Sequence, residues 1–208
     1  SELAKLSVVL ALAHFFSNNR PEYISKTKLL MPFFIVGIPF LLILKEPDLG
    51  TALLLVPALF AMLYLWGFRL KYLLILALVG IVASPVLFHF LKDYQKARLL
   101  VFVNPNADPL GAGYTIIQSK IAIGSGGFFG KGFMGGTQNQ LNFIPERHTD
   151  FIFAVVAEEG GFIAGLIILA LFWFIAKSGL TISSQTPDRF GSQLACGIST
   201  VLGLQALI

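Results

Sequence analysis

The sequence predicts an all-α membrane protein that crosses the bilayer several times. Hydrophobic residues make up 56% of the 208 residues and charged residues only 12%, whereas a soluble domain carries about 25% charged residues. Twenty phenylalanines add a large apolar load. Apolar segments of roughly membrane-spanning length recur along the chain, so most of this apolar surface is expected to face lipid or neighbouring helices.

The composition also excludes several classes of protein. A disordered chain, a basic nucleic-acid-binding domain and an ordinary cytosolic enzyme all need far more polar residues. The net charge of +4 reflects Lys and Arg in loops, and we expect no nucleic-acid partner. The single cysteine, Cys196, excludes an internal disulfide and a cysteine-based metal site.

About six spans are expected. We place five at residues 6–16, 29–44, 51–68, 72–91 and 151–176, and a sixth begins near Gly191. Four prolines inside these spans predict kinks. A long polar, glycine-rich segment, 92–150, joins the fourth span to the fifth, and residues 115–123 within it show the spacing of a short interfacial helix.

The two ends of the sequence predict a piece of a longer protein. The first residues carry neither a methionine nor a basic signal region, and the last residues lie within an apolar run. We expect residues 1–208 to form a single transmembrane domain that is incomplete at both ends.

Loop charges predict the orientation in the membrane. Loops 17–28, 67–71 and 177–190 are rich in Lys and Arg and lie on one side by parity. The positive-inside rule places these loops in the cytoplasm and the long loop 92–150 outside. Four polar residues near the mouths of the spans then share the outer side with this loop: Glu2, Lys5, Asp48 and Asp150.

The run GSGGFFGKG at residues 124–132 invites comparison with phosphate-binding loops but lacks their spacing. A Walker loop needs glycine at the position of Ser125 and a hydroxyl residue at that of Gly132, and the dinucleotide fingerprint needs glycine in place of Phe129. We therefore expect these glycines to let the backbone pack closely against a lipid or another loop.

Two acidic residues stand immediately before predicted spans. Asp48 and Asp150 each fit a helix N-cap, and each also fits an acid that lines an outer cavity. A carboxylate that is partly desolvated at Asp150 could act as a general base. His148 is the rival base, and Arg147 could hold a phosphate.

Glu158 and Glu159 lie about two turns into the fifth span, roughly 12 Å along it at about 1.5 Å per residue. A charge at that depth costs about 2.5–3.5 kcal/mol unless it is paired or hydrated. Because Glu158 lies about 80° from Asp150 around a regular helix, it is the better candidate to share a cavity with that residue. The alternative is structural hydrogen bonding to a neighbour. Arg98 ends a basic run that fits either lipid phosphates or a bound pyrophosphate.

Several of these blocks resemble the SEDS family (shape, elongation, division and sporulation). They are SELAK at 1–5, EPDLGTA at 46–52, Arg98 with the turn at Asn104, GYTIIQS at 113–119 and, above all, PERHTD at 145–150 followed by FIFAVVAEE. The run GTQNQLNFIPERH at 136–148 is more similar to the RodA-type, elongation branch than to the FtsW-type, division branch. Members of the family usually have ten spans.

The resemblance implies a peptidoglycan glycosyltransferase that polymerises lipid II at the outer face of the bacterial cytoplasmic membrane during elongation and cell-shape maintenance. The implied partners are a class B penicillin-binding transpeptidase and other membrane proteins of the elongation complex. The family's essential acid falls on Asp150. The remaining residues predicted to bind substrate are Glu2, Lys5, Asp48, Arg98, Arg147, His148 and Glu158.

The chemistry needs a base for a sugar 4-hydroxyl and cationic groups beside the pyrophosphate that leaves. Asp150 would be the base, with Arg98, Lys5 and Arg147 near the pyrophosphate, and a divalent cation (Mg²⁺ or Mn²⁺) could assist. Two alternatives stay open: a lipid II flippase or other transporter, and a non-catalytic scaffold for a transpeptidase.

Overall fold

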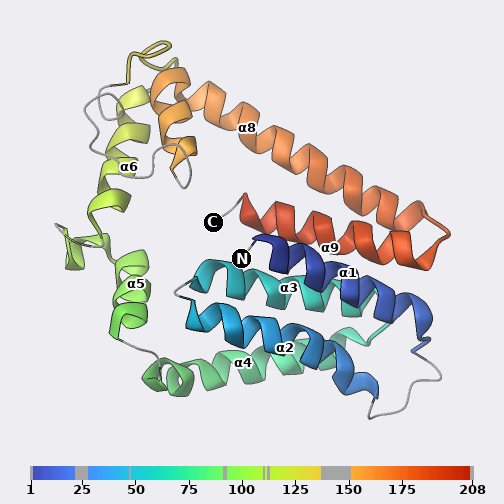
Figure 1. Ribbon diagram of the computed structural model, residues 1–208. Helices are drawn as coiled ribbons and strands as arrows, with labels where there is room; N and C mark the ends of the chain where they lie inside the picture. Colours follow the sequence, from blue (N-terminus) through green and yellow to red (C-terminus); the bar gives the residue numbers. More distant parts are fainter. Residues whose placement is uncertain are drawn as a thin grey trace. The chain divides into compact units, whose positions relative to one another are not determined.

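The computed structural model describes residues 2–21, 28–46, 48–90, 93–109, 111, 113–136 and 151–206, and all regular structure in these residues is helical. The helices are α1 (Glu2–Asn18), α2 (Met31–Lys45), α3 (Leu49–Leu65), α4 (Leu70–Phe90), α5 (Asp93–Val103), α6 (Tyr114–Gly126), α8 (Ile152–Gln185) and α9 (Arg189–Gln205), with 3₁₀ turns η1 (Lys28–Leu30) and η2 (Pro105–Ala107) (Figure 1). The chain divides into two units: the first holds Ser1–Leu87 and Phe172–Ile208, and the second holds Phe88–Leu171. The prediction of one domain over residues 1–208 stays a prediction.

The first unit is a helical bundle with an apolar core. α9 packs against α1 and α3, and α3 also packs against α2 (Figure 1). Leu12, Leu55 and Met62 are fully buried in this core. Gly197 of α9 faces Met62 so closely that a Cβ atom there would strike its side chain, and small residues of this kind let membrane helices approach one another.

Large apolar side chains remain exposed on the outer helices. Ile81 and Val82 of α4 are 68% and 69% exposed, and Trp173 and Phe174 of α8 are each 63% exposed. Such surface is costly in water and is typical of helices that face lipid.

Two of the described helical stretches, Lys28–Lys45 and Ile152–Gln185, are long and apolar enough to cross a membrane, whereas Gly50–Leu65 and Leu70–Pro85 are shorter apolar stretches. The count of six spans therefore stays a prediction.

All six predicted spans contain helices, but some boundaries differ. α8 continues to Gln185, so the predicted loop 177–190 shrinks to residues 186–188. The polar residues at this end do not stop the helix, because their hydroxyls bond to its own carbonyls: Thr181 donates to Lys177 and Ser184 to Thr181. On the same helix, the Lys177 ammonium lies over the Trp173 ring, 4.7 Å from its centre, in a cation–π contact.

Two helices lie within the predicted outer segment 92–150, and one of them was not expected from the sequence. Residues 93–103 form α5, which the polar first half of that segment concealed. The predicted short helix at 115–123 is confirmed and is longer, because α6 covers Tyr114–Gly126. Between them, the Asn104 side chain accepts a hydrogen bond from the Asn106 N–H at the start of η2.

Candidate functional site

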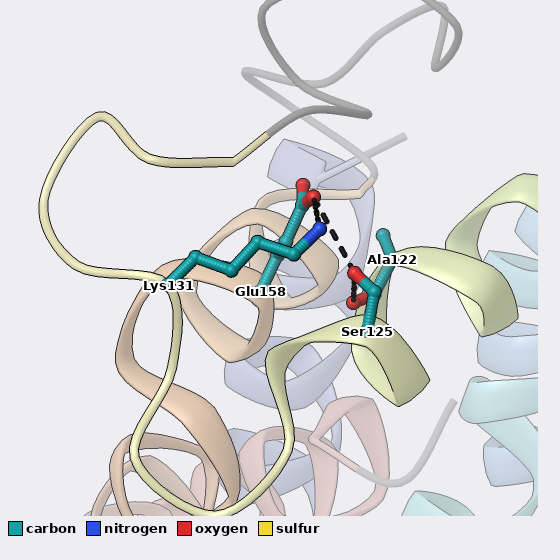
Figure 2. Close-up of polar contacts among 4 residues, drawn as sticks. All are labelled: Ala122, Ser125, Lys131 and Glu158. Atoms are coloured by element: carbon teal, nitrogen blue, oxygen red, sulfur yellow. Dashed lines mark hydrogen bonds and ion pairs between the residues drawn. The ribbon is translucent and has the colours of Figure 1, made fainter.

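A partly buried ion pair lies in the second unit, between the glycine-rich loop and the first part of α8. The Lys131 ammonium lies 2.8 Å from Oε1 of Glu158 (Figure 2). The Glu158 side chain is fully buried, whereas that of Lys131 is 27% exposed. The Ser125 hydroxyl lies 3.4 Å from the same carboxylate oxygen and 2.8 Å from the Ala122 carbonyl oxygen. The charge of Glu158 is therefore compensated inside the protein, as a desolvated carboxylate requires.

The α8 helix is broken at Gly161, shortly after Glu158 and Glu159. Gly161 has φ 70° and ψ −166°, a backbone conformation that is essentially restricted to glycine. A regular helix would join the N–H groups of Phe162 and Ile163 to the carbonyls of Glu158 and Glu159. The break at Gly161 removes both of these bonds.

The glycine-rich loop replaces the lost bonds. The N–H groups of Lys131 and Gly132 donate to the Glu158 and Glu159 carbonyls, at 3.1 and 3.0 Å. In return, Phe162 donates to the Gly127 carbonyl at 2.8 Å, and Ile163 donates to that of Phe128 at 3.4 Å. Each of these four backbone groups freed by the break thus finds a partner, which membrane proteins need where water is excluded.

Close backbone approach explains the glycines of this loop. A Cβ atom on Gly126 would meet the Ala157 carbonyl oxygen, and one on Gly130 would meet that of Glu159. Gly130 also has a positive φ of 78°. The sequence predicted that these glycines pack against a lipid or another loop. The structure corrects this expectation, because the loop packs against the backbone of α8.

The ion pair favours the structural reading of Glu158 that the sequence left open. Glu158 faces partners, as its depth in the span predicted: the Lys131 ammonium of the glycine-rich loop and the Ser125 hydroxyl of α6. Sequence reasoning missed Lys131, which is separated from Glu158 by 27 positions. The available signal was charge balance, because a buried glutamate needs a cation and Lys131 is the lone basic residue of the glycine-rich run.

Three predicted residues belong to the first unit. Lys5 pairs with Glu2 at 2.7 Å, with side-chain exposures of 3% and 69% respectively. Asp48 caps α3 by accepting the Thr51 N–H at 3.1 Å. The capping role predicted for Asp48 is confirmed, and its role in substrate binding stays a prediction.

The remaining predicted residues are described in part or not at all. Arg98 lies within α5, and its side chain is outside what the structure describes. Arg147, His148 and Asp150 lie outside the described residues. No group of three or more His, Cys, Asp or Glu side chains gathers in the part of the chain that the structure describes, and the divalent cation stays a prediction.

Comparisons with known proteins give the family context. The family model FTSW_RODA_SPOVE, described as "Cell cycle protein", matches residues 1–208. The chain is 45% identical over 206 residues to "Peptidoglycan glycosyltransferase MrdB" of Escherichia coli strain K12, and the match covers 97% of this chain and 55% of that protein. It is 37% identical to "Stage V sporulation protein E" of Bacillus subtilis, covering 100% of this chain and 57% of the relative. It is 36% identical to "Probable peptidoglycan glycosyltransferase FtsW" of Trichlorobacter lovleyi, and the match covers 100% of this chain and 54% of the relative.

A solved structure shows the same fold. It is described as "Structural coordination of polymerization and crosslinking by a peptidoglycan synthase complex", and it matches with a TM-score of 0.72 and 33% identity. The match covers 98% of this chain and 56% of the solved one. The chain thus spans a little over half the length of these relatives.

Proposed function

The chain belongs to the FtsW/RodA/SpoVE family of polytopic membrane proteins, known as SEDS, and from this premise we propose that the protein is a peptidoglycan glycosyltransferase of the RodA type. It polymerises lipid II at the outer face of the bacterial cytoplasmic membrane during elongation. The observation that carries the proposal is 45% identity, over 97% of this chain, to a relative named for this activity.

The reaction joins two sugars and releases polyprenyl pyrophosphate. The acceptor 4-hydroxyl attacks the anomeric carbon of the donor as Asp150 takes its proton, and the bond to the pyrophosphate oxygen breaks with inversion. Pyrophosphate is already a good leaving group, so cations beside it contribute more than an acid that protonates it. Arg98 and Arg147 are the proposed cations.

Lys5 needs a further step before it can bind a phosphate group. It is buried and paired with Glu2, so a pyrophosphate would have to displace the Glu2 carboxylate. Because the Glu2 side chain is 69% exposed, water can solvate its carboxylate after it is displaced, and no unpaired glutamate charge is left buried. Glu2 would then act by holding Lys5 in place until substrate arrives.

Glu158 and Lys131 are proposed to act as positioning residues. Asp150 precedes α8 by two positions in the sequence, and the ion pair fixes the first part of α8 on the glycine-rich loop. A rigid first turn favours a fixed placement of a base that is attached to it. Glu158 then serves the reaction through its effect on α8 and makes no contact with substrate.

Six spans and an outer segment 92–150 complete the proposed architecture, with the polar residues near the span mouths on the side where lipid II is consumed. The proposed partner is a class B penicillin-binding transpeptidase. The support for a crosslinking partner is the solved relative, which is described as a complex that coordinates polymerisation with crosslinking.

A lipid II flippase is the second candidate, because transporters also use helices broken within the membrane. In such transporters the freed backbone groups bind the substrate or a coupled ion. Here the freed groups at Gly161 are bonded to the glycine-rich loop, which favours the transferase.

The test is polymerisation of purified lipid II by the purified full-length protein, with and without a transpeptidase partner, beside a lipid II translocation assay in vesicles. Glycan strands that vanish in the Asp150→Asn variant support the proposal. Translocation without polymerisation, in the presence of the partner, would assign the protein to the flippase class. Polymerisation that occurs only when the partner is present, and that persists unchanged in Asp150→Asn, would support the scaffold reading.

A further inference from the structure

A pocket of about 300 Å³ lies at one end of the first unit, where three loops meet. Its lining includes Arg20 beyond α1, Trp66 at the end of α3, and Thr186 and Arg189 at the junction of α8 and α9. We call it the basic pocket. These residues belong to or border the three loops, 17–28, 67–71 and 177–190, that the positive-inside rule places in the cytoplasm. The fold therefore brings residues from all three loops together at one site.

The walls of the basic pocket are held by contacts between different helices. The Trp66 indole N–H donates to the Asn19 carbonyl at 2.8 Å, and the Phe16 and Trp66 rings lie 5.2 Å apart. When the amide of the buried Gln193 is oriented with its nitrogen toward Met62, it donates to the Met62 carbonyl and accepts from the Trp66 backbone N–H, each at 3.2 Å. A pocket built in this way exists before a ligand arrives, so little ordering cost opposes binding.

Two arginines give the basic pocket its positive charge, and both can reach a ligand from solvent. Arg20 and Arg189 are both exposed, and within the described part of the chain neither forms an ion pair. The neighbouring Asp188 carboxylate is engaged as the N-cap of α9, accepting the N–H groups of Phe190 and Gly191 at 3.3 and 2.7 Å. Guanidinium groups bind phosphate oxygens through two parallel hydrogen bonds, which an ammonium cannot match.

We propose that the basic pocket binds the phosphate of an anionic phospholipid head group from the cytoplasmic leaflet. A lipid fits better than free phosphate because apolar surface belongs to the pocket itself: Phe16 and Leu65 line it, and Leu65 is 38% exposed. Acyl chains can follow that surface while the phosphate rests on the arginines. Basic pockets between spans on the cytoplasmic side bind such lipids in other membrane proteins.

The test measures lipid binding to the purified full-length protein by native mass spectrometry, with phosphatidylglycerol as the probe and phosphatidylcholine as the neutral comparison. Replacing both arginines (Arg20→Gln with Arg189→Gln) should weaken phosphatidylglycerol binding by roughly tenfold or more, since each basic residue near the surface contributes about 1 kcal/mol. The matched control is Arg69→Gln with Lys71→Gln, which removes two charges from the same predicted face outside the pocket and should change binding little.

Several outcomes would overturn the proposal. They are unchanged affinity in the double arginine variant, an equal loss in the Arg69 and Lys71 control, equal binding of phosphatidylcholine, and full displacement of the lipid by excess inorganic phosphate. If the glutamine variant does not fold, Arg20→Lys with Arg189→Lys keeps the charge but loses the guanidinium geometry, and should bind with intermediate affinity. No step depends on glycan polymerisation, so failure here is distinct from failure of the proposed function.

Discussion

Lys131 contacts Glu158 twice: its backbone N–H donates to the Glu158 carbonyl at 3.1 Å, and its ammonium lies 2.8 Å from the Glu158 carboxylate. One residue of the loop therefore satisfies both the broken backbone and the buried charge of α8. The backbone contact depends on the break in α8, because an unbroken helix would engage the Glu158 carbonyl through the Phe162 N–H. The break at Gly161 and the charge at Glu158 form one structural device.

The first prediction concerns this ion pair. Lys131→Met removes the ammonium from a carboxylate that solvent does not reach, so it should destabilise the protein by about 1–3 kcal/mol or more. Glu158→Gln should also lower polymerisation, because the first turns of α8 lose their anchor. The measurement is thermal unfolding in detergent alongside lipid II polymerisation.

A double-mutant cycle tests whether the two residues act as a pair. Lys131→Met combined with Glu158→Gln should cost less than the sum of the single changes, because no unpaired charge remains buried. Lys120→Met, which changes an exposed lysine of α6, is the matched control and should behave as wild type. Strict additivity of the two changes would contradict the pairing.

The second prediction concerns Gly161. Gly161→Ala places a Cβ atom against the Gly130 N–H and the Phe128 carbonyl in a backbone conformation that only glycine adopts easily, so a loss of about 1–3 kcal/mol is expected from backbone strain alone. Gly165→Ala is the matched control on the same helix, because its Cβ meets only Phe153 at an ordinary 3.4 Å. If both variants unfold at the same temperature, the break at Gly161 is not required for stability.

These features show what the sequence could and could not predict. Apolar run length located six helices, and the position of Asp48 before an apolar run predicted its cap. Both are local signals. The Lys131 partner of Glu158 and the break at Gly161 depend on a loop that packs across the chain, and hydropathy carries no information on that pairing. The continuation of α8 through 177–185 was missed because its hydroxyl residues resemble a loop in composition but bond to the helix itself.

The third prediction separates the cap of α3 from a role in catalysis. Asp48→Asn keeps an acceptor for the Thr51 N–H, so it should leave stability nearly unchanged, whereas Asp48→Ala should cost about 1 kcal/mol. If Asp48 also lines the substrate cavity, Asn should lower polymerisation although it preserves the fold. Thermal unfolding and polymerisation are measured on both variants, and an Asn variant of full activity would leave Asp48 with the cap alone.

The fourth prediction concerns orientation. A membrane-impermeant thiol reagent applied to intact cells should label a cysteine at Asn106 and not one at Ser184, both exposed positions. Gln138 and Ser25 form a second pair of sites with the same expected result. Background from Cys196 should be low because this thiol is buried. Labelling of Ser184 but not Asn106 from outside would reverse the orientation and place the basic pocket on the outer face.

The fifth prediction concerns the base. Asp150→Ala should reduce glycan polymerisation by about 10²–10⁴-fold, the usual contribution of a general base, because the acceptor hydroxyl loses its proton acceptor. Lipid II binding should persist, since the pyrophosphate is proposed to rest on cationic side chains. Polymerisation and binding are measured with purified lipid II and the full-length protein, with a folding check on each variant.

The Asp150→Asn variant decides between the base and the cap. Asparagine caps a helix almost as well as aspartate, so a residue that only capped α8 would tolerate the change. A base would not, because the amide cannot accept the proton. We therefore expect Asn to be nearly as inactive as Ala while it unfolds at the wild-type temperature. An active and well-folded Asn variant would transfer the role of base to His148, and His148→Gln would then have to abolish polymerisation.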